Sequence, residues 1–173
     1  ISNMKFICNK DTILSVVQTT SKAAAGKSSI QALEGILMEL EGNTLTVTGY
    51  DLDIGIKTSI EVEGIESGNI VISAKMAVDI IRKMPSGSIT FECSGNNLAE
   101  ITNNMTSFSV SCSSADDYPN VPQVNPDTSF TMPQKLLKSM IIQTKFAVAV
   151  VDSKPALMGC KFELENNVLS VAA

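Results

Sequence analysis

The chain has 173 residues, of which 44% are hydrophobic and 18% charged, and its formal net charge is −5. This length suffices for one well-packed domain and part of a second, but no apolar run approaches the roughly 20 residues that a membrane-spanning helix needs. Histidine is absent, which excludes Ser-His-Asp and Cys-His catalysis and His-bearing metal sites.

The first elements form a strand, a helix and a hairpin. Met4 is the expected native start, and residues 1–3 are interpreted as additions ahead of it. Residues 4–9 (MKFICN) predict a strand, and the apolar stripe within residues 10–25 predicts a helix. Residues 32–40 and 44–49 predict two strands joined by the turn "EGN", and three isoleucines and a valine at even spacing predict a half-buried strand over 54–62.

The next elements repeat this alternation of strands and helix. Residues 69–73 predict a strand, and residues 74–84 a helix that "MPSG" ends. Three strands follow in "SITFEC", "LAEITN" and "SFSVSC", and then a proline-containing linker, "SSADDYPNVPQVNPD". Helices and strands in these proportions indicate an α+β fold with helices on one face of an antiparallel sheet.

The chain repeats itself at an offset of 124 residues. Between positions 6 and 49, 15 of 44 residues are identical to those 124 positions later, without a gap, and "ALEGILMELEGNTLTV" returns as "ALMGCKFELENNVLSV". A repeat this long indicates a duplicated structural unit of one strand, one helix and three strands. We expect a first unit at 4–120, a linker at 121–127, and at 128–173 the first part of a second unit.

Basic residues concentrate in the predicted helices. The helices 10–25, 74–84 and 134–145 hold eight of the 13 basic residues, but only Asp11 and Asp79 of the 18 acidic ones. Helix propensity favours Glu as much as Lys, so propensity alone does not explain this bias. It predicts contact with a polyanion through the helices, with Lys22, Arg82, Lys138 and Lys145 on one side.

Three short motifs are interpreted as structural. "AAAGKSS" has Ser21 where a phosphate-binding loop needs glycine, and it follows a helix instead of a strand. Asp51 and Asp53 share a face of a strand without an evident third metal ligand, and Asp116 and Asp117 precede a proline turn. The four cysteines contain no C-x-x-C pair and are expected to be buried free thiols of a cytoplasmic protein. We therefore predict no catalytic residue, metal or cofactor.

The stretches "MKFICNKDTILSVVQTTSKA", "ALEGILMELEGNTLTVTGYDLDIGI" and "CSSADDYPNVP" resemble the bacterial sliding clamp, the beta subunit of DNA polymerase III. The resemblance covers the chain from Met4 to Ala173. It implies a DNA-clamp fold in which similar domains build a subunit and two subunits close into a ring around duplex DNA, with helices lining the hole. It also implies replicative DNA polymerase and the clamp loader as partners, a homodimer at full length, and no enzymatic activity of its own.

The resemblance assigns roles to individual residues. It implies DNA contact for Lys27 and Lys154, and channel-lining positions for Arg82 and Lys83. It also implies that two further pairs serve partner binding: Leu157 and Ala173 in the groove for clamp-binding peptides, and Phe108 and Val110 at the edge that meets the partner subunit. Without the resemblance, the residues leave two alternatives: a carboxylate-metal phosphotransferase built on Asp51 and Asp53, and a protein-interaction module with a basic face.

Overall fold

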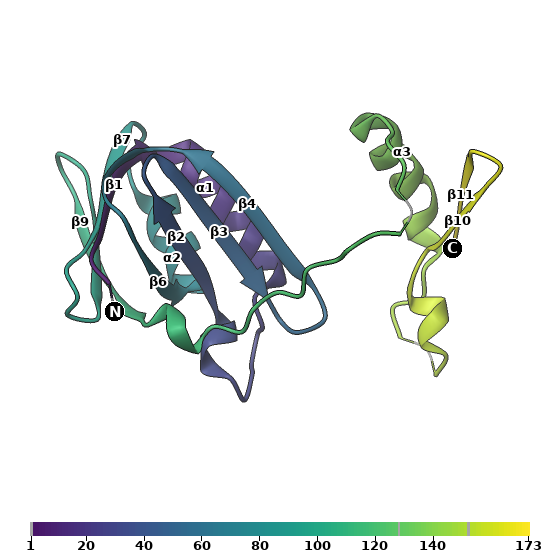
Figure 1. Cartoon of the computed structure of the whole chain (residues 1–173), viewed down its shortest axis with the longest axis horizontal. Coiled ribbons are helices and arrows are strands. Elements are labelled where there is room, and N and C mark those ends of the chain that lie inside the picture. Colours follow the sequence, from purple (N-terminus) through teal and green to yellow (C-terminus); the bar gives the residue numbers. More distant parts are fainter. Residues whose placement is uncertain (1, 128, 152) are drawn as a thin grey trace. The chain divides into compact units, whose positions relative to one another are not determined.

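The computed structural model describes residues 2–127, 129–151 and 153–173 of the 173-residue chain (Figure 1). The chain divides into two units, Ile1–Gln123 and Val124–Ala173. The expected boundaries at residues 120 and 121 lie close to this division, whereas the expected first residue of the second unit, residue 128, lies outside the described residues.

Unit 1 is an antiparallel sheet covered by two helices. The strand order is β4-β3-β2-β6-β9-β8-β7-β1-β5, and α1 and α2 lie side by side behind the sheet in the view of Figure 1. The strands are β1 (Met4–Asn9), β2 (Gly35–Glu41), β3 (Thr44–Tyr50), β4 (Gly55–Glu61), β5 (Glu63–Glu66), β6 (Gly68–Ser73), β7 (Ser88–Cys93), β8 (Leu98–Thr102) and β9 (Ser107–Ser113). The helices are α1 (Lys10–Thr20) and α2 (Ala74–Lys83), with short 3-10 turns η1 (Ser21–Ala23), η2 (Gln31–Glu34) and η3 (Ala115–Asp117).

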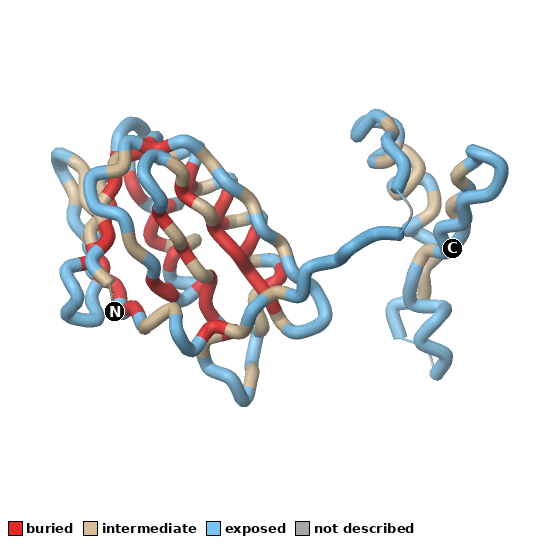
Figure 2. Tube along the Cα trace, in the orientation of Figure 1, coloured by how far each residue is buried: buried red, intermediate tan, exposed pale blue. Residues whose placement is uncertain are grey.

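Each helix begins at a capping side chain and buries one stripe. Asn9 Oδ1 accepts the amides of Asp11 and Thr12 at 2.9 and 3.3 Å, and Ser73 Oγ accepts the amide of Met76 at 3.4 Å. The apolar faces point into the core, whose buried segments are red in Figure 2. In this core the rings of Phe6 and Phe91 stack with their centroids 5.1 Å apart. The faces left outside the core are mainly polar, although Met76 of α2 is 46% exposed.

Strand β9 joins the two halves of the sheet. It pairs with β8 from Ser107 to Ser111, but with β6 only at Val71↔Ser113 and Ile72↔Cys112. The side of β9 that faces away from β8 is consequently open over residues 107–111. The other side of the strand is occupied by β8 over residues 107–111.

Unit 2 repeats part of unit 1 element for element. Its α3 (Gln134–Thr144) and 3-10 turns η4 (Lys145–Ala147) and η5 (Pro155–Met158) lie 124 positions after α1, η1 and η2, and its hairpin is β10 (Lys161–Glu165) with β11 (Val168–Ala172). The register also repeats, since Leu40↔Leu45 in the first hairpin corresponds to Leu164↔Leu169 in the second. The repeat in the sequence is thus a repeat in structure.

The two copies differ in burial. Phe6 and Leu40 are buried in unit 1, whereas their counterparts Phe130 and Leu164 are 52% and 42% exposed. None of the residues of α3 is buried, and Figure 2 colours unit 2 in tan and pale blue. The local hydrogen bonds therefore recur without the surrounding core.

Several element boundaries differ from those expected. Residues 32–34 belong to the 3-10 turn η2 and not to a strand, and the first α-helix ends at Thr20 instead of residue 25. Thr20 ends the helix with its hydroxyl bonded to the Val16 carbonyl at 3.0 Å, after which the chain tightens into η1. Strand β5 was not expected, and it forms because its residues pair with β1 across the sheet.

The cysteines are free thiols, and Cys8, Cys93 and Cys112 are buried. Burial raises the pKa of Cys8 and of Cys112 to about 12. The Sγ atoms of Cys93 and Cys112 lie 3.3 Å apart within the core. The raised pKa values of Cys8 and Cys112 leave these two thiols almost without thiolate at neutral pH, so they are unreactive there.

Candidate nucleic-acid interface

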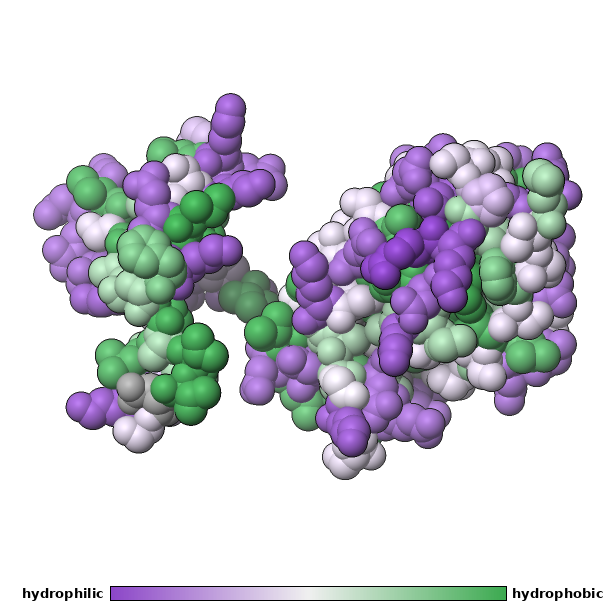
Figure 3. Space-filling model, turned by 180° about the vertical axis from the view of Figure 1, so that it is seen from behind, coloured by the Kyte–Doolittle hydropathy of each residue, from purple (hydrophilic) through white to green (hydrophobic). Residues whose placement is uncertain are grey.

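The outer face of the helical layer in unit 1 is basic. The core side of α2 is formed by Ala77, Ile80 and Ile81, which leaves Lys75, Arg82 and Lys83 exposed to solvent. Lys22, in η1 at the end of α1, is exposed as well. Figure 3 views unit 1 from the helical side and shows hydrophilic residues on this face, interspersed with apolar ones.

Lys22 and Arg82 line one shallow hollow between α1 and α2, about 420 Å³ in volume. The other lining residues are Ser15, Gln18, Thr19, Ser21 and Val78, so no carboxylate lines the hollow. Arg82 Nη1 lies 3.9 Å from Asp79 Oδ1, but both side chains are about half exposed, and such pairs contribute little. The guanidinium therefore remains available to an external anion.

Acidic residues occupy the opposite face of the strands. Glu39, Glu92 and Glu100 alternate with buried residues along β2, β7 and β8, which places them on the face away from the core. Two lysines partly neutralise this face, Lys5 with Glu92 at 2.8 Å and Lys57 with Glu39 at 4.0 Å. The charge of unit 1 is thus segregated, with the helical side basic and the sheet side acidic.

Lys27 lies in the loop between η1 and η2 and is exposed. The loop is held behind it, because Glu34 Oε1 accepts the amide of Ser28 at 3.1 Å and Ser28 Oγ accepts the amide of Ile30 at 3.1 Å. Lys27 therefore lies beside a part of the loop whose backbone is held by hydrogen bonds.

Unit 2 carries its own basic residues. Lys135, Lys138 and Lys145 on α3 and η4 are exposed, and these two elements contain no acidic residue. Lys154 precedes η5, and its carbonyl accepts the amide of Leu157 at 2.9 Å. Asp152, two positions before it, lies outside the described residues.

The residues expected to serve partner binding fall into two groups. Leu157 is 53% exposed on η5, and Ala173 is exposed after β11. Val110, in contrast, is only 5% exposed and belongs to the core, and Phe108 packs against the core from the same face of β9. The open edge of β9 therefore presents its backbone and the outward Ser107, Ser109 and Ser111.

Asp51 stabilises a loop. Its Oδ1 accepts the amides of Asp53 and Ile54 at 3.0 and 2.7 Å, which closes the turn between β3 and β4. Asp116 likewise accepts the Ser114 hydroxyl at 2.9 Å. Within residues 2–127, 129–151 and 153–173, no group of three or more potential metal ligands is found.

Sequence reasoning missed the polar side chains between the two basic ones. Ser15, Gln18 and Thr19 lie on one face of α1, and Lys22 follows three residues later in η1. That spacing is visible in the sequence. The proximity of Lys22 to Arg82 is not, since it depends on how α1 packs against α2.

The chain matches the family model described as the N-terminal domain of the DNA polymerase III beta subunit over residues 4–122. A curated relative, the beta sliding clamp of Halalkalibacterium halodurans, is 33% identical over 98% of this chain and 47% of its own length. The beta sliding clamp of Bacillus subtilis is 32% identical with the same coverage. The chain therefore spans about half the length of the curated relatives it matches.

Solved structures match over nearly the whole chain. The crystal structure of a DNA polymerase sliding clamp from Bacillus subtilis has a TM-score of 0.87 at 31% identity, over 97% of this chain and 46% of that one. A putative DNA polymerase III beta subunit from Eubacterium rectale has a TM-score of 0.88 at 33% identity, with the same coverage. The described helices include none long and apolar enough to cross a membrane.

Proposed function

Because this chain belongs to the family of the DNA polymerase III beta subunit, we propose that the protein is a DNA polymerase processivity factor, a non-catalytic sliding clamp of DNA replication. Its partners are duplex DNA, the replicative polymerase and the clamp loader, and it acts as a homodimeric ring in the bacterial cytoplasm. The observation that carries the DNA contact is the hollow between α1 and α2 that Lys22 and Arg82 both line.

The chemistry of this face suits a sliding contact. Cations and hydroxyl groups bind phosphate oxygens, which are the same at every step of the duplex, so they hold DNA without reading its sequence. We assign this contact to Lys22, Lys27, Arg82 and Lys83 in unit 1, and to Lys138, Lys145 and Lys154 in unit 2. The acidic sheet face repels DNA, so the helical side is the one that faces the duplex.

Two further surfaces complete the proposal. Leu157 and Ala173 belong to the groove for the clamp-binding peptides of polymerase and clamp loader, and the half-exposed leucine is available to an apolar anchor. The open backbone of β9 at residues 107–111 is the edge to which the partner subunit adds a strand, while Phe108 and Val110 hold that edge onto the core.

The DNA contact is tested by fluorescence anisotropy of a labelled duplex. We expect the 173-residue chain to bind with a Kd of roughly 10⁻⁴ to 10⁻⁶ M at physiological salt. Lys22→Gln and Arg82→Gln should each weaken binding and reduce the salt dependence by about one phosphate contact. Lys57→Gln removes the same charge from the sheet face and is the matched control. An equal loss in this control would contradict the assignment of the helical face.

The ring is tested separately, on the gene product that carries this sequence. With its clamp loader, we expect it to stay on nicked circular duplex DNA at high salt and to be lost when the circle is cut. Retention on linear DNA would contradict topological binding.

A further inference from the structure

Two buried thiols meet inside unit 1, at the end where β7 turns back into β8. Cys93 is the last residue of β7, and Cys112 lies 19 positions later, near the end of β9. Their side chains are 1% and 7% exposed, and both belong to the main core. The two Sγ atoms are 3.3 Å apart, although β7 and β9 are not neighbours in the sheet.

The strand between them explains this contact. In β8, Ala99 pairs with Cys93 on one side and with Val110 on the other. Ala99 is completely buried, and its side chain is a single methyl group. The amide of Cys112 donates to the Asn97 carbonyl at 2.9 Å, one residue before β8 begins. The two cysteines therefore flank the start of β8, where a small residue leaves room for their sulfur atoms to meet.

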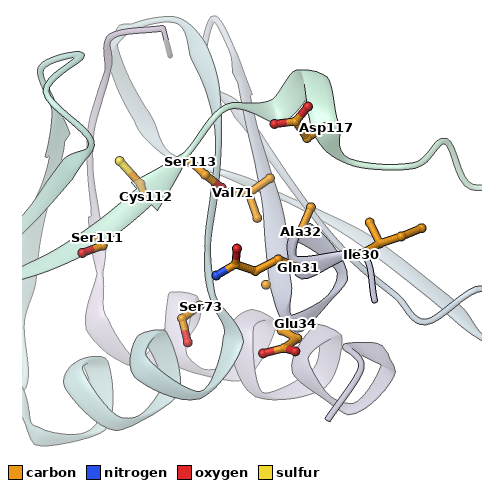
Figure 4. A pocket seen from close by; sticks show the side chains of 11 residues that line it. Ile30, Gln31, Ala32, Glu34, Val71, Ser73, Ser111, Cys112, Ser113 and Asp117 are labelled. Carbon is orange, nitrogen blue, oxygen red and sulfur yellow. The ribbon is translucent and has the colours of Figure 1, made fainter. Parts of the chain in front are cut away.

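The pair lies close to the surface of unit 1. Residues 94–97, which form the turn next to it, are all exposed. Cys112 also belongs to the wall of an open hollow of about 620 Å³, and Figure 4 shows its sulfur atom pointing away from Gln31 and Val71 on the other side of that hollow. A molecule as small as hydrogen peroxide therefore reaches the sulfur atoms by local opening of the turn, without unfolding of the whole unit.

Two adjacent thiols can bind a metal ion or be oxidised. A protein metal site of this kind needs further ligands. Within residues 2–127, 129–151 and 153–173, the two cysteines are not part of any group of three or more potential ligands. A disulfide needs no third residue, only two Sγ atoms that can approach to about 2.05 Å. Because these sulfur atoms are already in contact, their arrangement favours oxidation.

We propose that Cys93 and Cys112 are a redox site, which a hydroperoxide converts into an intramolecular disulfide and a thiol reductant restores. With hydrogen peroxide, the sulfur that has lost its proton attacks one oxygen, the O–O bond breaks, and a sulfenic acid forms while hydroxide takes up that proton as water. The second thiol then attacks the sulfenic sulfur. The S–S bond forms, the S–O bond breaks, and a second water leaves. Two thiols are thus oxidised by two electrons, and the peroxide is reduced to two waters.

The disulfide fastens β9 where its pairing is weak. Strand β9 pairs with β6 at two positions, Val71↔Ser113 and Ile72↔Cys112. The new bond ties the same end of β9 to β7 and closes a loop between residues 19 positions apart. A cross-link of this kind stabilises a fold mainly by restricting the unfolded chain. Oxidation therefore makes unit 1 more resistant to unfolding and secures the strand whose other side is open over residues 107–111.

Cys8 in β1 is a matched comparison for the pair. Burial raises the pKa of Cys8 to about 12, and burial, the hydrogen bond with Cys93 and the charge of an ionised Cys93 raise the pKa of Cys112 to about 12. Oxidation is therefore slow at neutral pH and accelerates as the pH rises. Cys8 and Cys112 hold similarly little thiolate, so contact with Cys93 is what distinguishes Cys112.

The test treats the 173-residue chain with hydrogen peroxide at pH 9. All proteins carry Cys160→Ser, because Cys160 is partly exposed and reacts on its own. The remaining thiols are alkylated in acidified denaturant, and the peptides are analysed by mass spectrometry. We expect Cys93 and Cys112 to be linked, with loss of the mass of two hydrogen atoms, and Cys8 to be alkylated at least tenfold more than either. The Tm should rise by roughly 5 to 10 °C, and dithiothreitol should reverse both changes.

The matched variant is Cys112→Ser, in which peroxide should produce no linked peptide and no rise in Tm. The result in the parent does not depend on the folding of this variant, because global unfolding would expose Cys8 as much as Cys93 and Cys112. Alkylation of all three thiols to the same extent would overturn the proposal, as would addition of oxygen to Cys112 without linkage. Neither outcome concerns DNA binding, so the redox site and the proposed function are tested independently.

Discussion

Gly49 lies where the end of α1 meets strand β3. A Cβ atom at this position would overlap the carbonyl of Thr20. We predict that Gly49→Ala lowers the free energy of unfolding by about 2 kcal/mol, because either the helix end or the strand must move. Urea denaturation measures this, with Gly26→Ala as control, since a Cβ there meets nothing within 4 Å. Equal stability of both variants would show that the helix end yields without cost.

Ionisation of the Tyr118 hydroxyl makes the free energy of unfolding depend on pH in the alkaline range. Burial raises the pKa of its hydroxyl to about 12, so the folded state holds the proton more tightly than the unfolded state, in which the pKa is about 10. Its contribution is therefore fully present below pH 10 and is lost as the pH rises from about 10 to about 12.

The measurement compares wild type with Tyr118→Phe. We expect the difference in unfolding free energy between them to be constant below pH 10 and to change by about 2 kcal/mol, against the wild type, between pH 10 and 12. Taking the difference cancels the thiols and lysines that also titrate in this range. A difference that stays flat would mean that the Tyr118 hydroxyl is solvated.

At the scale of the element, β9 has two faces and one open side. We predict that Val110→Lys destabilises unit 1 by about 3 kcal/mol, because it places a charge in the core. Ser109→Lys should change stability by less than about 0.5 kcal/mol, because this side chain is exposed.

The same pair of variants tests the open edge. The wild-type chain should associate at high concentration through residues 107–111, and Ser109→Lys should reduce this, because charges beside an open edge hinder further pairing. Light scattering over a concentration series measures the association. If the folded Ser109→Lys variant associates as strongly as wild type, the contact uses another surface.

The elements that the sequence predicted well are those with local signals. The stripes of α1, α2 and α3 and the turn after β2 depend on residues within one or two turns of each other. Strand β5 and the turn η2 were missed because pairing with β1, and the tight fit of Leu33 under Tyr50, involve residues far apart in the sequence. The basic composition of the helical face was predictable because it depends only on which residues lie in the helices. The burial of Val110 was not predictable in this way, because it depends on how the whole sheet packs.

At the scale of the whole molecule, the two units should differ in protection from exchange. Thr20 Oγ1 bonds the Val16 carbonyl at 3.0 Å, and Thr144 Oγ1 bonds the Met140 carbonyl at 2.9 Å, so α1 and α3 have matching local structure. Of these two helices, α1 has buried residues and α3 has none. We predict that amide hydrogens of α3 exchange at least roughly 100-fold faster than those of α1, because local opening of α3 exposes little new apolar surface.

Hydrogen-exchange mass spectrometry resolves the two helices, and each serves as the control for the other. Equal protection would contradict the prediction and would indicate that another molecule covers the apolar face of α3. Dilution distinguishes that case, since protection that depends on association falls with concentration.

The constant offset of 124 residues between the two units means that neither copy has gained or lost a residue relative to the other. The loop from η1 to η2 and the loop from η4 to η5 have the same seven-residue length, 24–30 and 148–154, although surface loops ordinarily gain and lose residues at little thermodynamic cost. Most of their side chains have diverged, so length was kept where identity was not. We therefore expect a one-residue deletion in either loop to be harder to tolerate than most substitutions within it.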